Sequence, residues 1–161
     1  MEYKAYKTVE DSRSEWMKVL QYEDINGQGR LYGGRLMEWM DQVAGIAAER
    51  HCQDNVTTAA VDNLQFKHAA LLNDLIVISS KVTFVGRTSM EVRCDVYIED
   101  RETGKRMPIN RAYFTEVHVN DEGKPVPIEY GLRLESESDK AEWEGALKRL
   151  DVRKKRRAEG F

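Results

Sequence analysis

The sequence predicts an α+β domain in which an antiparallel sheet curls around one long helix. Residues 34–52 have apolar side chains on nearly every side of the expected helix, and such a helix is usually wrapped by other structure. Four strand-like segments follow this helix. The chain has 161 residues, which is enough for one domain with a substantial core. One buried helix followed by a run of antiparallel strands implies the curled sheet.

Strands are expected both before and after this helix in the sequence. Residues 16–20 have the composition of a strand, and residues 56–66, 75–85 and 107–119 are strand-like. The clearest strand covers residues 90–99, where apolar residues at even positions alternate with mostly polar residues at odd positions. That alternation is typical of a strand with one buried face. Turns are expected at Gly86-Arg87, at Glu102-Thr103-Gly104-Lys105 and at Asn120-Asp121-Glu122-Gly123.

The C-terminal segment has a different character, so we divide the chain into a main domain at 1–134 and a helical basic tail at 135–161. In the tail Trp143, Leu147 and Leu150 recur at helical spacing, and a run of Lys and Arg follows at 153–157. We expect a surface-docked helix with a solvated, partly frayed basic end, since cations are favourable near a helix C-terminus. The alternative is that this basic run contacts phosphate groups or nucleic acid.

Composition excludes several classes of protein. Charged residues make up 33% of the chain and the net charge is only −3, whereas a dedicated nucleic-acid binder is normally basic over a whole face. No apolar run approaches the ~20 residues of a membrane helix, and residues 1–4 lack the layout of a secretory signal. Cys52 and Cys94 give neither a disulfide framework nor metal-ligand spacing, and Cys94 falls on the apolar face of a strand as plain core. We therefore expect a soluble cytoplasmic protein without a metal, and with neither nucleic acid nor membrane as a partner.

The stretch from Asn26 to Asp41 is the most informative part of the chain. Four of the 11 glycines lie between positions 27 and 34, in a loop that lets backbone approach a ligand closely. The loop opens directly into the expected helix, whose first N–H groups have no intrahelical partner and attract negative charge. About two turns later Asp41 stands among apolar residues, and Gly45 one turn beyond it suggests that something approaches closely there. A donor-rich helix start beside a carboxylate in apolar surroundings has the parts needed for acyl transfer.

The same residues carry a resemblance to a known family. The pattern Asn26-x-x-Gly29-x-x-x-Gly33-Gly34, followed by Met40-Asp41, resembles the acyl-CoA hydrolase family of the hotdog fold, whose sheet wraps one central helix. The similarity covers roughly residues 24–128 and continues in register through Ala47–Cys52, Val56–Ala59, Val61-Asp62, Phe66, Gly86–Val92, Ala112-Tyr113 and Gly123–Pro125.

The chain departs from that family at two places. The family usually has a proline just after the position of Phe66, where this chain has Lys67-His68-Ala69. It also favours Gly-Asp where this chain has Asn73-Asp74. Both places lie in a connection between strands, so they bear on the range of substrates rather than on the fold.

The resemblance implies an acyl-CoA thioesterase of fatty acid metabolism, which hydrolyses acyl-CoA to a carboxylic acid and CoA. No separate cofactor is expected, because CoA is part of the substrate. Asp41 would act as a general base on water or as a nucleophile, and the sequence leaves both open. Asn26, from the partner subunit, would position water or substrate. The backbone N–H groups of Gly33 and Gly34 would bind the thioester oxygen, and such donors commonly contribute about 3 kcal/mol.

Three further residues and a strand threonine are weaker candidates. Arg87, Thr88 and Ser89 follow a glycine at a bend and would grip the phosphates or pantetheine of CoA, since an arginine fork suits phosphate oxygens. Thr58 is a candidate hydroxyl beside the reacting atoms. Without the resemblance, residues 87–89 could equally be an exposed polar turn, and Thr58 could be an ordinary strand residue.

Asp41 and Asn26 have alternative roles as well. Asp41 could pair with a buried arginine or cap a neighbouring loop, and Asn26 could be a turn residue bonded to its own backbone. His51 lies ten residues after Asp41, about 15 Å further along the helix, so the two cannot form a dyad in one chain. We expect His51 to bond locally at the helix end, and His68 and His118 to lie in a loop and on a strand surface.

The resemblance also implies a homodimer, or a trimer of such dimers, with the active site shared between subunits. A small sheet on one helix leaves edges and an open face that a second copy can cover. Two other functions stay open. An acyl-thioester hydratase or dehydratase needs a histidine working with an acid, and the helix supplies Asp41 without one nearby. An acyl-CoA-binding or sensing module would keep the fold without hydrolysis.

Overall fold

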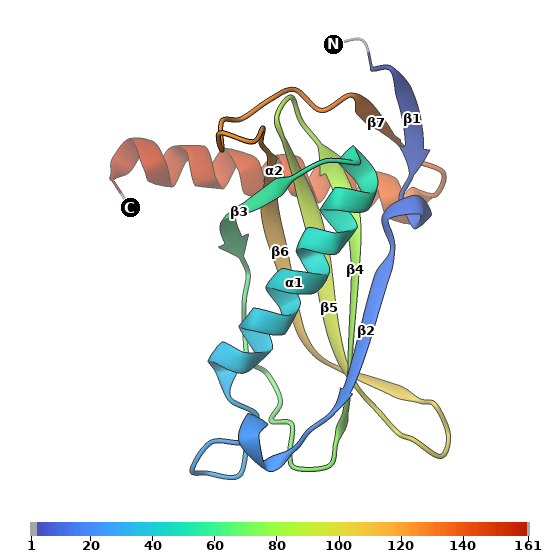
Figure 1. Ribbon diagram of the computed structural model, residues 1–161, viewed down its shortest axis with the longest axis vertical. Coiled ribbons are helices and arrows are strands. Elements are labelled where there is room, and N and C mark those ends of the chain that lie inside the picture. The colour runs from blue at the N-terminus through green and yellow to red at the C-terminus, as the bar shows by residue number, and fades with distance from the viewer. Residues whose placement is uncertain (1–2, 161) are drawn as a thin grey trace.

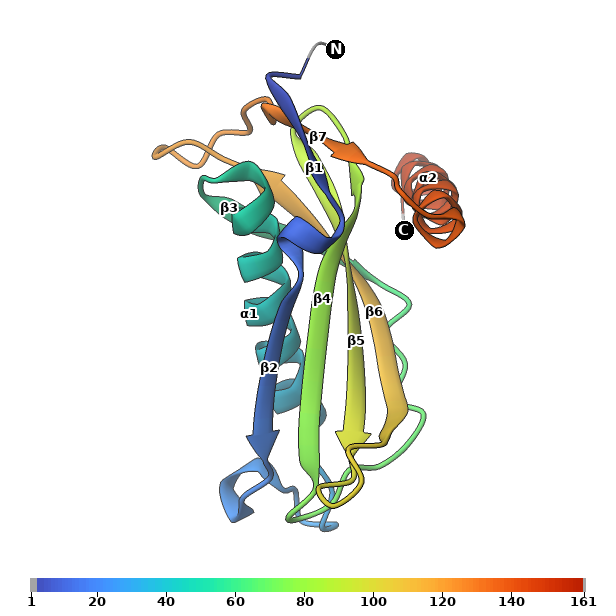
Figure 2. The same cartoon turned by 90° about the vertical axis from the view of Figure 1, so that its right-hand side faces the viewer.

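A computed structural model describes residues 3–160 and confirms the predicted fold (Figure 1). A five-stranded antiparallel sheet packs against the long helix α1 (Gly33–Cys52). Its strands, in spatial order, are β2 (Ser14–Val19), β4 (Leu75–Val85), β5 (Ser89–Glu99), β6 (Arg106–His118) and β3 (Val56–Asp62). The second helix, α2 (Glu137–Glu159), lies against the opposite face of the sheet, so the domain has three layers (Figure 2). No helix within residues 3–160 is long and apolar enough to cross a membrane.

The strands agree closely with the sequence patterns. Strand β4 covers the expected residues, whereas β3 ends at Asp62, earlier than expected, because Asn63 turns into a left-handed conformation with φ 58°. Two short strands, β1 (Ala5–Thr8) and β7 (Tyr130–Arg133), pair in parallel beside the main sheet. Two short 3-10 helices, η1 (Glu10–Ser12) and η2 (Tyr22–Asp24), lie before and after β2 in the sequence.

The core lies between α1 and the inner face of the sheet. Met40 of α1 is fully buried, and truncating such a side chain to alanine costs about 2–5 kcal/mol. The even-numbered residues of β5, including Cys94, face this core as the alternation predicts. One expectation was wrong, because α1 is not wrapped on every side. Its far face is exposed and carries Arg35, Glu38, Asp41, Gln42, Ile46 and Glu49.

Helix α2 docks on the sheet mainly through ion pairs. The outer face of β5 is polar, and Arg149 of α2 places Nη2 2.7 Å from Oε1 of the buried Glu91. Arg93 of β5 forms an ion pair with Glu142 of α2 in the same layer. The guanidinium of Arg149 also stacks 3.5 Å from the ring centre of Tyr113. Charge pairing between largely buried groups therefore helps to hold this helix in place.

The expected apolar stripe on α2 was wrong in part. Trp143 packs on Phe84 with ring centres 4.6 Å apart, but Leu147 is 46% exposed. The basic end is not frayed either, since α2 continues to Glu159 and Arg153 forms an ion pair with Asp62 at the end of β3. The face that meets the sheet is the one that carries Glu142, Trp143, Ala146, Arg149 and Arg153.

Candidate active site

Asp41 and Thr58 are brought together by α1 and the edge strand β3. The hydroxyl of Thr58 donates a hydrogen bond to Oδ1 of Asp41, 2.7 Å away. Both side chains are exposed, and they border an open cavity of about 390 Å³. The structure thus joins two residues that the sequence singled out separately. The residues that line this cavity are Asp41, Gln42, Gly45, Ile46, Glu49, Val56, Thr58 and Glu116.

A second carboxyl group at this cavity, Glu116, was missed from the sequence. It is directly opposite Thr58 in the β3–β6 ladder, and its two oxygens lie 3.0 and 3.2 Å from the Thr58 hydroxyl oxygen. Its side chain is only 1% exposed, and burial raises the pKa of Glu116 to about 7, helped by the negative charges of Asp41 and Glu49. A glutamate on the apolar face of the predicted strand was the signal that could have revealed it.

The surroundings of Asp41 differ from those expected. Its cavity is lined by Gln42, Glu49 and Thr58 as well as by apolar groups, so the carboxylate is not in apolar surroundings within one chain. A Cβ atom at Gly45 would meet nothing within 4 Å. The close approach that Gly45 suggested is therefore not made by this chain, and the helix presents an open face there.

The start of α1 lies at a different cavity. Gly33 and Gly34 are the first two residues of the helix, and Tyr32, at the N-cap, makes no side-chain capping bond. The ring of Phe66 lies 3.3 Å from the place where a Cβ atom of residue 33 would be, so a side chain there would press on this ring. Gly33, Phe66 and Asn26 all line this second cavity, of about 310 Å³.

Asn26 acts as a turn residue within its own chain. Its Oδ1 accepts hydrogen bonds from the backbone N–H groups of Gln28, at 2.9 Å, and Arg30, at 3.2 Å. Gly29 in the same loop has a left-handed φ of 76°. Asn26 lines the cavity at the helix start and Asp41 lines the other one, so a single chain does not bring them together.

The turn at Arg87, Thr88 and Ser89 lies far from the helix start. Its backbone carbonyls accept hydrogen bonds from Ile128, at 2.8 Å, and from His118, at 2.9 Å, near the C-terminal end of α1 (Figure 1). A helix of this length spans about 30 Å, which separates the turn from Gly33 in one chain. The Arg87 side chain is exposed and free to meet a ligand from outside.

Two of the three histidines are buried, which corrects the expectations for both. His51 bonds through Nε2 to the carbonyl oxygen of Tyr130 on β7, 3.0 Å away, rather than locally at the helix end, and burial lowers the pKa of His51. His118 lies on the buried face of β6, with Nε2 3.1 Å from Oδ2 of Asp54, and not on the strand surface. His68 is exposed in a loop, as expected.

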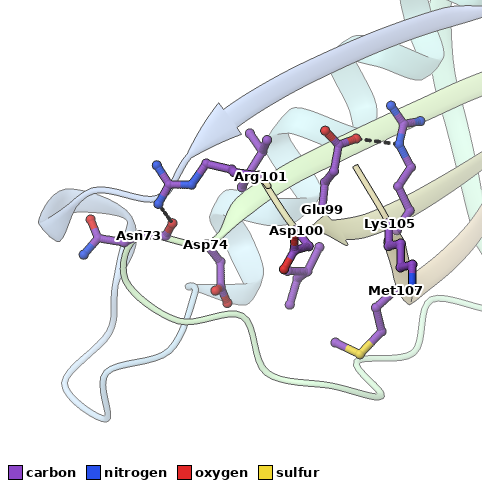
Figure 3. Close-up of a pocket in the computed structure, with 10 residues that line it drawn as sticks. Asn73, Asp74, Glu99, Asp100, Arg101, Lys105 and Met107 are labelled. Carbon is purple, nitrogen blue, oxygen red and sulfur yellow. Dashed lines mark hydrogen bonds and ion pairs between the residues drawn. The ribbon is translucent and has the colours of Figure 1, made fainter. Parts of the chain in front are cut away.

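Another cavity, of about 440 Å³, lies between the start of β4 and the β5–β6 turn (Figure 3). It holds an ion pair of 2.7 Å between Arg106 and Glu99, and Arg101 donates to the carbonyl oxygen of Asn73. Asn73 has a left-handed φ of 70°, which accounts for the glycine that the resembled family favours there. The candidate site residues all lie within residues 3–160, and none of them lines this cavity. Among residues 3–160, no three His, Cys, Asp or Glu side chains are grouped as metal ligands.

Comparison with known proteins gives consistent matches. The sequence pattern of the Thioesterase superfamily matches residues 28–105. A cytosolic acyl coenzyme A thioester hydrolase from Rattus norvegicus is 36% identical over 154 residues, covering 92% of this chain and 40% of that protein. The chain thus spans about 40% of the length of the mammalian relatives that it matches.

Solved structures match over nearly the whole chain. A hexameric acyl-CoA thioesterase is 34% identical with a TM-score of 0.89, covering 96% of this chain and 97% of that one. An acyl-CoA hydrolase from Staphylococcus aureus, in complex with butyryl coenzyme A, coenzyme A and coenzyme A disulfide, is 30% identical with a TM-score of 0.89 and coverage of 96% and 94%. Variants of that hydrolase with alanine at one asparagine, one threonine or one aspartate match equally well.

Proposed function

Because the chain belongs to the thioesterase superfamily, among the hotdog-fold acyl-CoA hydrolases, we propose that it hydrolyses acyl-CoA to a free carboxylic acid and CoA. The observation that carries the proposal is the hydrogen bond from Thr58 to Asp41 beside an open cavity. The asparagine, aspartate and threonine replaced in the S. aureus enzyme have the same spacing along that chain as Asn26, Asp41 and Thr58 have here. This agreement supports the three residues as parts of one site.

Asp41 acts on the thioester in one of two ways. As a general base it takes a proton from water, whose oxygen bonds to the acyl carbon; as a nucleophile it forms a transient anhydride that water then cleaves. In both routes the carbon–sulfur bond breaks and the thiolate takes up a proton that came from water. A thiol with a pKa of about 8.5 leaves readily as thiolate, so the site needs no strong general acid.

The N–H groups at the helix start stabilise the negative charge that develops on the thioester oxygen. Gly33 and Gly34 offer these groups, and the positive end of the helix dipole adds to their effect. Phe66 lies against Gly33 and supplies an apolar wall beside this position. An apolar ring therefore adjoins the proposed oxyanion site.

A second copy of the chain completes the site. Asn26 and Gly33 line one cavity of the chain and Asp41 lines another, so the Asn26 and the helix start that serve a given Asp41 come from the partner. Strand β3 is an edge of the sheet with exposed residues from Thr57 to Ala59, and an unpaired edge can pair with another copy. The hexameric neighbour is consistent with a homodimer that assembles further.

CoA is bound as part of the substrate, and no separate cofactor is needed. We assign its phosphates or pantetheine to the turn at Arg87, Thr88 and Ser89, where Arg87 is exposed. The mammalian relatives are cytosolic enzymes by name, and we place this activity in the cytoplasm too. The hydratase alternative lacks support, because no histidine is among the described residues that line the Asp41 cavity.

Thiol release from a series of acyl-CoA substrates of increasing chain length tests the proposal. Wild-type protein should release CoA from at least one of them, and a folded Asp41→Asn variant should lose most of that activity. Tight binding of acyl-CoA without thiol release would contradict hydrolysis and favour the sensing module.

A further inference from the structure

The Thr58 hydroxyl oxygen lies within hydrogen-bonding distance of three carboxyl oxygens but carries only one hydrogen. It lies 2.7 Å from Oδ1 of Asp41 and 3.0 and 3.2 Å from the two oxygens of Glu116. A hydroxyl donates one hydrogen bond and otherwise accepts, whereas an ionised carboxylate can only accept. Two ionised carboxylates would therefore leave one of these contacts without a hydrogen. A proton on one of the two carboxyl groups satisfies both contacts.

Burial decides which carboxyl group holds that proton. Asp41 is exposed to water, whereas Glu116 is 1% exposed on the inner face of β6. A buried carboxyl group loses the hydration that stabilises its charged form, and an exposed one keeps it. The neutral acid is therefore Glu116, which donates to Thr58, and Thr58 donates to the ionised Asp41.

The acidic side chains of α1 that face Glu116 favour the same arrangement. Helix α1 contributes Asp41 and Glu49, both of which raise the pKa of Glu116. The neighbouring strands contribute Thr58 on β3 and Met90 on β5, neither of which carries a charge. Along β6 itself the next residue on the same face is His118, whose ring is bonded to Asp54 and to the carbonyl of Pro127. Among the described residues that line the Asp41 cavity, none is a cation that could hold Glu116 ionised.

We propose that Glu116 is a positioning residue that, in its protonated form, donates to Thr58 and so directs the Thr58 hydrogen to Asp41. The inference rests on the proposed thioester hydrolysis and adds a residue to it. A hydrogen bond to an ionised carboxylate is roughly twice as strong as one between neutral groups, so Asp41 is held in one orientation as an anion. No proton is consumed, because Glu116 keeps its own throughout the reaction.

Loss of the Glu116 proton should switch the arrangement off. Two anions would then compete for one hydroxyl hydrogen, and Asp41 would face a second negative charge across Thr58. Activity should therefore fall on the alkaline side as pH rises through a value near 7, the pKa to which burial raises Glu116.

The first test compares the pH profiles of wild type and Glu116→Gln. The glutamine amide can donate to Thr58 but cannot titrate near neutral pH, so kcat should stay within about threefold of wild type at pH 6 and the alkaline fall near pH 7 should disappear. Glu49→Gln is the matched control, since it removes a neighbouring negative charge without touching Thr58. In that variant the alkaline fall should persist and move to slightly lower pH. An unchanged alkaline fall in Glu116→Gln, or loss of activity at every pH in a folded Glu116→Gln protein, would overturn the proposal.

A second measurement detects the Glu116 proton without relying on enzyme activity. Infrared difference spectra recorded between pH 5 and pH 9 should show the carbonyl band of a neutral carboxylic acid that titrates near neutral pH and is missing in Glu116→Gln. Absence of such a band in wild type would show Glu116 to be ionised and would refute the inference even if the enzyme hydrolyses thioesters. Presence of the band together with no thiol release would leave the proton in place and refute the hydrolysis instead.

Discussion

Thr58 of β3 and Asp41 of α1 are joined by a hydrogen bond of 2.7 Å, although 17 positions separate them in the sequence. This bond ties the edge strand to the exposed face of the helix. It also occupies one oxygen of the Asp41 carboxylate and fixes the direction of the other. The orientation of the Asp41 carboxylate therefore depends on a side chain from a different element.

Thr58→Val should remove this bond while keeping the shape of the side chain. We expect kcat to fall about 10- to 100-fold, which corresponds to about 1.4–2.7 kcal/mol. Thr57→Val is the matched control, because Thr57 is also exposed on β3 but alternates to the other face of the strand. Steady-state kinetics of both variants check this expectation, and equal rates for them would contradict a role of Thr58 beyond strand formation.

Asp41→Asn should leave the fold and the affinity for CoA nearly intact but lower kcat about 100-fold or more, or about 3 kcal/mol. The amide has nearly the same shape as the carboxylate but cannot accept the proton of water or attack a carbonyl carbon. Thiol-release kinetics and CoA binding measure the two effects separately. A folded variant with full activity would remove Asp41 from the mechanism.

Mixing two inactive variants tests whether the site is shared. Asn26→Ala chains and Asp41→Ala chains together should regain about a quarter of the wild-type activity after subunit exchange, because half of the dimers would hold one intact site. Native mass spectrometry of the mixture verifies that exchange has occurred. Exchange without any recovered thiol release would place both residues in one chain.

The stability of the protein should depend on pH through Glu116. Burial raises the pKa of Glu116 to about 7 in the folded chain, above the value of about 4.3 for an unfolded glutamate. Its contribution to stability is therefore fully present below about pH 4 and is lost as pH rises to about 7. Urea unfolding should find Glu116→Gln more stable than wild type at pH 8 by up to about 4 kcal/mol and similar to it at pH 4. A difference that does not change with pH would contradict the raised pKa.

Arg149→Met should destabilise the domain strongly. It would leave the carboxylate of Glu91, which is 2% exposed, without the guanidinium that lies 2.7 Å away, and breaking a buried pair in this way costs about 3–5 kcal/mol. Lys148→Met is the control, because Lys148 is exposed on the same helix. Chemical unfolding measures both, and the double variant Glu91→Leu with Arg149→Met should recover much of the loss. A small effect of Arg149→Met alone would show that α2 is held by other contacts.

The layout of the main domain could be predicted because its signals are local. The alternation from Met90 to Glu99 directly reports which side chains of β5 face the core, and the helix from Gly33 shows its buried face through apolar spacing. The extent of β3 was harder to predict, since the end at Asp62 depends on the backbone conformation of one asparagine.

The polar contacts could not be predicted in the same way, because each depends on a distant partner. Glu116 interrupts the apolar face of its strand, but its partner Thr58 lies 58 positions away. The apolar stripe expected on α2 failed for a related reason. The outer face of the sheet is polar, so the helix turns Glu142 and Arg149 toward it and leaves Leu147 in water.

The negative charge of the Asp41 cavity acts on the acid that the proposed thioester hydrolysis would form. Three carboxyl groups line the cavity, and none of the described residues lining it is basic. The reacting end of a thioester is uncharged and enters without repulsion, whereas the acid that hydrolysis forms is an anion. Two like charges 4 Å apart repel by about 1 kcal/mol in water and about 4 kcal/mol at the effective dielectric constant of a protein surface. If the proposed hydrolysis occurs here, this repulsion favours release of the acid, and we expect a free carboxylate to inhibit the reaction only weakly.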